Sequence, residues 1–368
     1  MTTGLIGRRI KALREERGLS QESVAHLFGF KDRQTVSAIE TGARRVTAEE
    51  LLLAVVRLGA PLEYFTDPFL LAGEGCFSWR QTGVEVERLK ACEQSAGRWI
   101  GAYRALAPQV GYETPLMRRT LGLTRHARFE DAMAAGERFA TEFDLGEVPS
   151  VRLMEVMERE LGILVLMMDT ERGISGAACR LPELDAVLIA RREVVGRRHF
   201  DLAHELFHIL TWDAMPPEHS EEPMETGGNR AEQLTNNFAA AVLMPTAILA
   251  RFGSWSDLAE DKLIRKLHTV ANKLRVTASA LRWRLVALGE LKPAVARSLP
   301  DAALRNNIPE LAENSPPARF SKPFMHVLGL AIDKGLISVR SVAGLLDLSV
   351  EDLGDLFSAH DVQCEIEL

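Results

Sequence analysis

The most informative segment of this chain is Arg197-Arg198-His199-Phe200-Asp201-Leu202-Ala203-His204-Glu205-Leu206-Phe207-His208-Ile209-Leu210. Residues four apart lie one above the other on a helix, so His204 and His208 can hold one metal ion from the same face. Glu205 is one step further round the helix, where this motif places the general base that takes a proton from metal-bound water. Apolar residues at three- and four-residue steps predict a buried flank that holds both imidazoles still: Phe200, Ala203, Phe207 and Leu210.

The alternative reading of this pair is two ordinary half-buried histidines on an amphipathic helix. A second predicted helix argues against it: Asn229-Arg230-Ala231-Glu232-Gln233-Leu234-Thr235-Asn236-Asn237-Phe238-Ala239-Ala240-Ala241-Val242-Leu243-Met244-Pro245. A catalytic zinc ion needs a third protein ligand and keeps its fourth position for water. Glu232, 24 residues after His208, can be that ligand. Asn236 lies four residues further on the same face and can orient a ligand histidine.

Together, these segments resemble the ImmA/IrrE-type zinc metallopeptidases of bacteria and their mobile elements. The resemblance rests on Arg-x-x-Phe-x-x-Ala-His-Glu-Leu-x-His followed by Glu-x-x-x-Asn-x-Phe-Ala-Ala-x-x-Leu-Met-Pro, and it covers roughly residues 146 to 290. It implies that His204, His208 and Glu232 bind Zn2+ and that Glu205 is the catalytic carboxylate. Thr235 stands where this family usually has alanine or a similar small residue.

The composition allows two or three soluble domains, with 368 residues of which 46% are hydrophobic. Four cysteines without C-x-x-C spacing predict neither a disulfide framework nor a cysteine zinc site. The N-terminus lacks the apolar core of a signal peptide, and no apolar run approaches the roughly 18 residues of a membrane span. We therefore expect a cytoplasmic protein that has no membrane partner.

The net charge of -7 argues against a chain that binds nucleic acid along its whole length. The charge is uneven, however. Residues 1 to 65 hold 10 Lys or Arg and 8 Asp or Glu, whereas the rest of the chain holds 34 and 43. The basic side of the protein is therefore its N-terminal part.

Residues 5 to 65 read as five short helices, with Ser20 and Thr47 as caps and Gly18 as a left-handed stop. A helix, a short turn and a second helix form the geometry that enters the DNA major groove, although a plain helical bundle is the alternative.

The pattern resembles the Xre/Cro-type helix-turn-helix of phage repressors, through Leu-Ser-Gln-Glu-x-x-Ala, Thr-Val-Ser-x-Ile-Glu-x-Gly and Arg-x-x-Thr-x-x-x-Leu. The resemblance implies a DNA-binding domain over residues 1–68 that pairs as a homodimer on a palindromic operator in double-stranded DNA. It makes Glu40 a structural residue at a helix end. The residues that it directs to base edges are Arg33, Gln34, Thr35 and Ser37. Those that it places near phosphates are Gln21, Arg44 and Arg45.

The predicted fold class is mainly α with a small β-sheet (α+β). Residues 69–145 form a helical connector that either packs or dimerises, and residues 146–290 form the peptidase domain. In that domain a helix from Pro149 precedes three strands, over 162–168, 175–181 and 186–190, and then the two metal helices. This is the general build of thermolysin-like peptidases, where an extended substrate pairs with an edge strand. Residues 186–190 are the candidate edge.

Two later segments leave alternatives open. His219, in the loop 212–228, is either an extra metal or oxyanion group or an exposed histidine. Residues 291–368 form a helical C-terminal domain, whose apolar stretches 324–333 and 339–346 belong either to a helical cap or to a degenerate helix-turn-helix.

The leading functional hypothesis is a DNA-binding regulator fused to a zinc-dependent endopeptidase. The resemblance implies that its substrate is a repressor-type helix-turn-helix protein or the chain itself, in control of stress-response or mobile-element genes. The alternative is a regulator whose peptidase-like domain only senses a metal, a peptide or a small ligand. A purely structural protein leaves both motifs unexplained.

Overall fold

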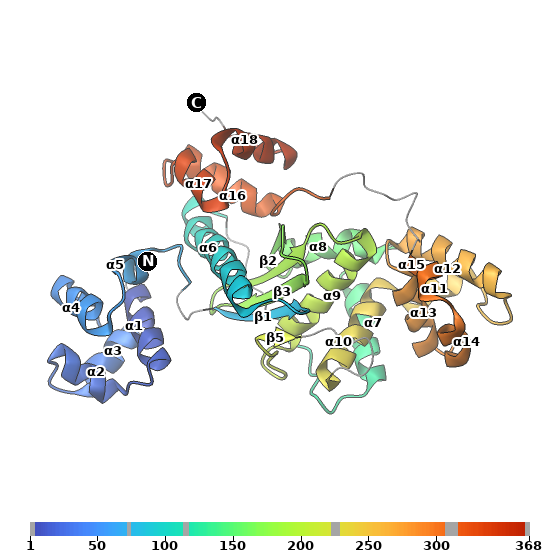
Figure 1. Cartoon of the computed structure of the whole chain (residues 1–368), viewed down its shortest axis with the longest axis horizontal. Helices are drawn as coiled ribbons and strands as arrows, with labels where there is room; N and C mark the ends of the chain where they lie inside the picture. Colours follow the sequence, from blue (N-terminus) through green and yellow to red (C-terminus); the bar gives the residue numbers. More distant parts are fainter. Residues whose placement is uncertain (1–3, 72–74, 113–117, 222–228, 306–315, 365–368) are drawn as a thin grey trace.

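The computed structural model describes residues 4–71, 75–112, 118–221, 229–305 and 316–364. It is mainly helical with one small β-sheet, as predicted. Figure 1 shows an N-terminal helical bundle, a sheet covered by helices, and C-terminal helices that lie over α6.

Within its described residues, the N-terminal bundle consists of five short helices, as predicted for residues 5 to 65. Its helices are α1 (Leu5–Glu16), α2 (Gln21–Phe28), α3 (Arg33–Glu40), α4 (Ala48–Leu58) and α5 (Leu62–Thr66). Side chains of Ser20, Asp32 and Thr47 cap α2, α3 and α4 by accepting backbone N–H groups that a helix start leaves unpaired. Apolar residues at helical spacing meet in one small core that includes Ile10, Val24, Val36, Ile39 and Leu58.

The sheet has five strands in the order β2-β4-β3-β1-β5. Their bounds are β1 (Cys76–Gln81), β2 (Ile163–Met168), β3 (Ile174–Arg180), β4 (Asp185–Ala190) and β5 (Ser220–Glu221). β3 is antiparallel to both of its neighbours, whereas β2 is parallel to β4 and β5 is parallel to β1.

Two expectations about this sheet were wrong. Residues 186–190 lie in β4, which is bonded on one side to β2 and on the other to β3, so they are not an edge. The predicted connector also contains a strand, since β1 pairs with β3 from Cys76 opposite Arg180 to Arg80 opposite Gly176. A strand with apolar residues on both faces does not show in its own sequence which strands will lie beside it, because strand order depends on pairing with distant segments.

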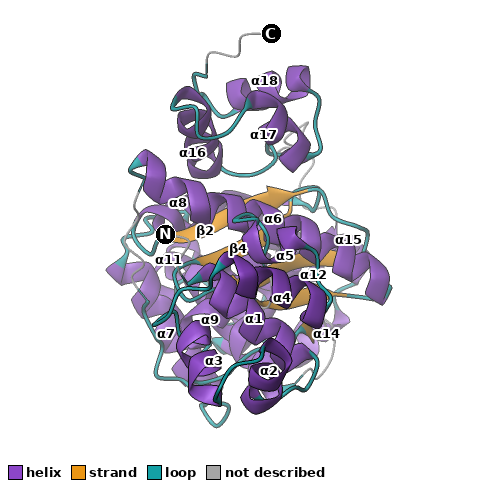
Figure 2. Cartoon of the chain, turned by 90° about the vertical axis from the view of Figure 1, so that its left-hand side faces the viewer, coloured by secondary structure: helices purple, strands orange, loops and turns teal. Residues whose placement is uncertain are grey.

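Helices cover both faces of the sheet (Figure 2). Alternate strand residues point to opposite sides, so Val165, Ala178 and Val187 enter one core and Leu166, Ala177 and Leu188 the other. The first core is covered by α7 (Phe129–Glu142), α8 (Pro149–Arg159), α9 (Val195–Thr211), α10 (Arg230–Leu243), α12 (Glu260–Leu274) and α13 (Ala278–Ala287). The second is covered by α6 (Val86–Val110), α16 (Lys322–Asp333), α17 (Val339–Leu346) and α18 (Val350–Ala359).

The packing differs from the predicted domain divisions. Helix α7, expected in the connector, packs against α10. Four short elements complete the set: α11 (Thr246–Leu249), η1 (Ala250–Phe252), α14 (Pro293–Ser298) and α15 (Asp301–Arg305). The last two pack on α13, so residues 293–305 join the first core and only α16–α18 form the cap over α6. Among the described residues, no helix is both long and apolar enough to cross a membrane.

Candidate metal centre and nucleic-acid interface

The two histidines of the motif meet a carboxylate, as expected. His204 and His208 lie on α9 with their Nε2 atoms 3.1 Å apart. Glu232, in the first turn of α10, places its two carboxylate oxygens 3.5 Å from the two Nε2 atoms. All three side chains are buried, and in the described part of the chain they form the one group of this kind with metal-ligating spacing.

This donor set fits a zinc ion. Ligand atoms at zinc bond lengths of about 2.0–2.1 Å in a tetrahedral site lie about 3.3–3.5 Å from one another. The two Nε2 atoms are 3.1 Å apart, and each lies 3.5 Å from a different oxygen of Glu232. One atom from each of the three residues can be chosen so that all lie within 4.8 Å of one another. Two imidazoles and one carboxylate are also a ligand set that leaves a fourth position open.

Neighbouring side chains fix the orientation of these ligands. Asn236 Oδ1 lies 3.2 Å from Nδ1 of His204, which leaves Nε2 of that ring turned towards Glu232. Asn229 caps α10 by accepting the N–H groups of Ala231 and Glu232. The capping bonds set the first turn of the helix, and hence the position of Glu232.

The flank of α9 is buried as its sequence predicted. Ala203, Phe207 and Leu210 belong to the first core, and Phe200 is partly buried against it. Phe207 also packs on Phe238 of α10, with ring centroids 5.2 Å apart. This contact joins the two ligand-bearing helices, so the histidines and the carboxylate are held by packed side chains rather than by loops.

Glu205 is enclosed beside the ligands, with 1% of its surface exposed. Its Oε1 has no hydrogen-bond partner among the described residues. Burial raises the pKa of Glu205 well above its usual range, and the positive charge of Arg80 opposes this shift. On strand β3, a Cβ added at Gly176 would lie 3.4 Å from Oε1, at van der Waals contact. The same Cβ would lie only 2.9 Å from the backbone oxygen of Leu188, so the close approach of β4 is what favours glycine at this position.

Arg80 and Asp201 form an ion pair that the sequence did not reveal. Arg80 lies on β1, and its Nη1 contacts Oδ1 of Asp201, one helical turn before Glu205 on α9. Asp201 is buried, and this burial raises its pKa to about 6 in spite of the charge of Arg80. The pair joins residues 121 positions apart in the chain, so no local spacing could have indicated it.

His219 is not part of the metal group. Its Nε2 lies 2.8 Å from Oε2 of Glu93, and its side chain is largely exposed. The reading as an exposed histidine is therefore the one that the geometry favours. Residues 222–228 of the same predicted loop lie outside the described residues.

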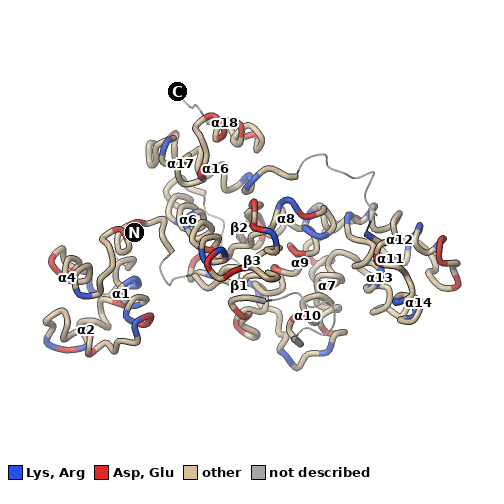
Figure 3. The backbone as a smooth tube through the Cα atoms, viewed as in Figure 1, with Lys and Arg blue, Asp and Glu red and all other residues tan. Residues whose placement is uncertain are grey.

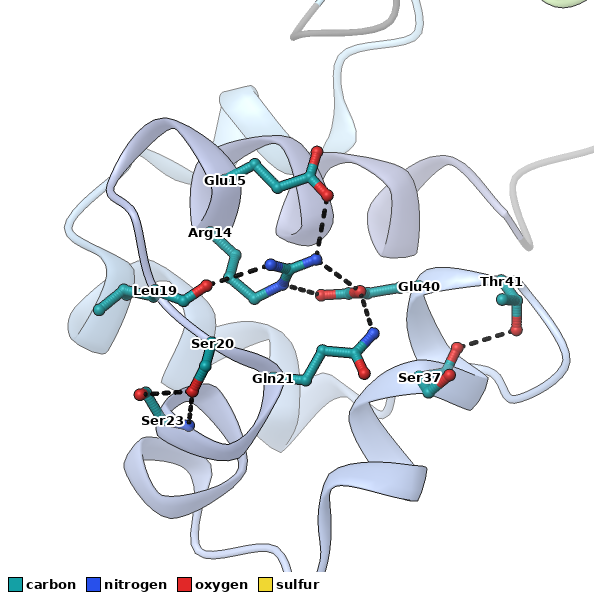
Figure 4. A network of polar contacts seen from close by, with 9 residues as sticks. All are labelled: Arg14, Glu15, Leu19, Ser20, Gln21, Ser23, Ser37, Glu40 and Thr41. Carbon is teal, nitrogen blue, oxygen red and sulfur yellow. Dashed lines mark hydrogen bonds and ion pairs between the residues drawn. The ribbon is translucent and has the colours of Figure 1, made fainter.

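In the N-terminal bundle, Glu40 has the structural role that was expected of it (Figure 4). Its carboxylate is buried at the end of α3, where it accepts hydrogen bonds from Arg14 Nε at 2.6 Å and from Gln21 Nε2 at 2.8 Å. The network ties α1, α2 and α3 together. Gln21, which was predicted to contact phosphate, is thus engaged inside the domain.

The predicted base-reading residues lie on the side of α3 that faces away from the bundle core. Arg33 and Gln34 are exposed, and Thr35 and Ser37 are partly exposed. Arg45 is also exposed, but Arg44 makes two bonds to the carboxylate of Glu50, at 2.7 and 3.1 Å. Basic and acidic residues are mixed over this bundle rather than gathered on one face (Figure 3).

Comparison with known families agrees with this geometry. Residues 10–65 match the family model described as helix-turn-helix, and residues 158–286 match that of the IrrE N-terminal-like domain, a peptidase family. The chain thus joins a segment similar to Xre-type helix-turn-helix domains to a segment similar to IrrE N-terminal-like domains. Searches of curated proteins and of solved structures give no significant match.

Proposed function

We propose that this regulator, with its DNA-binding domain and its peptidase-like domain, is a zinc-dependent endopeptidase. It cleaves itself or a repressor-type partner, and thereby controls stress-response or mobile-element genes. The observation that carries the proposal is the convergence of one ligand atom each from His204, His208 and Glu232, all within 4.8 Å of one another, beside the buried Glu205. A structural role would not require three ligand atoms and an unbonded carboxylate oxygen in one buried place.

Each residue then has a role. His204, His208 and Glu232 hold the zinc ion, and Asn236 keeps the His204 ring in the binding tautomer. When bound, zinc would polarise the peptide carbonyl and make water acidic enough to be deprotonated near neutral pH. Glu205 takes the proton of the attacking water and passes it to the leaving amine.

The DNA-binding part of the proposal rests on the exposed side of α3. Arg33, Gln34, Thr35 and Ser37 read base edges, and Arg45 contacts phosphate. Gln21 and Arg44 can contribute from their bonded positions next to α3. Domains of this type pair half-sites about one helical turn apart, so we propose a homodimer on a palindromic operator.

The deciding experiment is Glu205→Gln in the full chain. The substitution keeps the size of the side chain and removes the base, so proteolysis should fall by about 10²- to 10⁴-fold while zinc content and operator binding stay. Wild type and variant are incubated with zinc and with repressor-type proteins, and the fragments are identified by mass spectrometry. Glu193→Gln, at an acidic residue just before α9, is the matched control and should cleave as wild type does.

A different outcome would favour the sensor. If wild type and Glu205→Gln regulate the operator alike, and no zinc-dependent fragment forms in either, the domain binds its metal without chemistry. The endopeptidase proposal would then be refuted.

A further inference from the structure

Strand β1 lies outside the IrrE-like domain in sequence and inside its sheet in space. The family match covers residues 158–286, whereas β1 spans Cys76–Gln81. The matched region contributes the three bonded strands β2-β4-β3 and the two-residue strand β5, and β1 lies between β3 and β5. Without β1, the side of β3 that faces away from β4 would be a free edge. The segment that follows the helix-turn-helix domain therefore occupies an edge that the peptidase-like domain would otherwise present.

That edge is the one beside Glu205. A Cβ added at Gly176 of β3 would lie 3.4 Å from Oε1 of Glu205, at van der Waals contact, so this strand position is a neighbour of the carboxylate. Gly176 is also the register partner of Arg80 in β1. A free strand edge recruits an extended peptide through its unpaired backbone N–H and C=O groups. β1 is antiparallel to β3 and satisfies those groups itself.

Side chains hold β1 in this position from both faces. On the α9 face, the Arg80 guanidinium pairs with Asp201, and both side chains are shielded from water. On the α6 face, Trp79 is fully buried and donates its Nε1–H to Glu93 at 2.9 Å. These contacts hold β1 between the two cores, and a substrate peptide that pairs with β3 would have to displace them.

We propose that β1 is a built-in occupant of the substrate edge. An extended protein segment pairs with β3 only when β1 leaves, and the Arg80–Asp201 ion pair holds β1 in place. This inference rests on the proposed function in one respect, namely that the site takes extended polypeptide. The segment that joins the DNA-binding domain to the sheet thus controls access of substrate to that site.

The first test locks the strand. Ser78 and Ala178 are buried register partners, and Cβ atoms of opposed residues in antiparallel strands lie about 4.5–5.5 Å apart, close to the span of a disulfide. Ser78→Cys with Ala178→Cys, in a Cys76→Ser background, therefore gives a reversible covalent lock. The chain also carries Glu205→Gln, so that binding is measured without cleavage.

The probe is a fluorescein-labelled peptide with the sequence of residues 75–82, in which serine replaces the cysteine. Its binding to the full chain is followed by fluorescence anisotropy. Arg80→Met should tighten binding by about 10-fold or more, because a larger fraction of molecules has released β1. Arg88→Met is the matched control and should leave binding unchanged, since Arg88 makes exposed ion pairs with Glu85 and Glu171.

The oxidised lock should abolish binding of the peptide, and reduction should restore it. Because the lock keeps Arg80, it tests the inference even if Arg80→Met does not fold. Equal affinity in the locked, reduced and Arg80→Met chains would overturn the inference, since β1 would then be an ordinary strand of the sheet.

The same locked and reduced chains with Glu205 restored separate this inference from the proposed function. Peptide binding that follows β1 release, without any zinc-dependent cleavage, would support the occupant and refute the endopeptidase. Cleavage that proceeds equally in the locked and reduced chains would support the endopeptidase and refute the occupant.

Discussion

Replacing Asn236 by alanine should weaken zinc binding although Asn236 is not a proposed ligand. His204 is fully buried, and Oδ1 of Asn236 lies 3.2 Å from its Nδ1. When Nε2 of His204 binds a metal, Nδ1 carries the proton and needs an acceptor. Without Asn236 that buried N–H is left unpaired, at a cost of about 1–3 kcal/mol.

This cost converts into affinity. A difference of about 1.4 kcal/mol is a factor of ten in a binding constant, so Asn236→Ala should weaken zinc binding by about 5- to 150-fold. Losing a partner that orients a metal ligand typically costs about 10- to 100-fold, which agrees with the range worked out here. Asn236→Asp keeps an acceptor oxygen and should lose much less.

The assay is competition for zinc between the full chain and a chromophoric chelator near neutral pH. Asn237→Ala is the matched control, since the neighbouring Asn237 donates its amide to the backbone oxygen of Gln233 in the same helix, at 2.8 Å. Equal zinc affinity in the Asn236→Ala and Asn237→Ala chains would refute the reasoning, because Asn236 would then not orient a ligand.

Three further predictions concern the ligands, the DNA surface and pH. Elemental analysis should find about one zinc per chain and its loss in Glu232→Ala; a variant that kept full zinc while His204→Ala lost it would show that the third ligand is misassigned. In footprinting, Gln34→Ala should relax the sequence preference at one base position. Arg45→Ala should weaken binding to all DNA sequences alike and lower the slope of affinity against salt concentration by about 1. An unchanged footprint in both variants would contradict the assigned DNA-binding surface. Burial raises the pKa of Glu158 from 4.5 to about 7, because the buried site favours the neutral carboxyl. The contribution of this carboxyl to the free energy of unfolding is fully present below pH 4.5 and is lost as the pH rises through 7. Glu158→Gln should therefore exceed wild type in free energy of unfolding by up to about 3 kcal/mol near pH 8 and by much less near pH 5; the same difference at both pH values, measured by denaturant unfolding, would rule this out.

Local patterns were enough for the parts of the protein that are built from neighbouring residues. The four-residue spacing of His204 and His208 places both on one side of a helix, whatever that helix packs against. Capping residues such as Ser20 and Thr47 mark helix starts because their oxygens bond N–H groups only two or three residues away. The fold class, the two family resemblances and the pairing of the histidines with a carboxylate could therefore be predicted from the sequence.

The tertiary structure decided the parts that depend on distant contacts. Residues 186–190 have the apolar composition of a buried strand, but composition does not say which strand lies beside another. β1 was missed because a six-residue strand has little signal of its own, and its partner β3 lies about 100 residues further along the chain. The ion pair of Arg80 and Asp201 arises from that pairing. A charged side chain shows in a sequence only that it is charged, and folding alone determines which opposite charge it meets in a buried site.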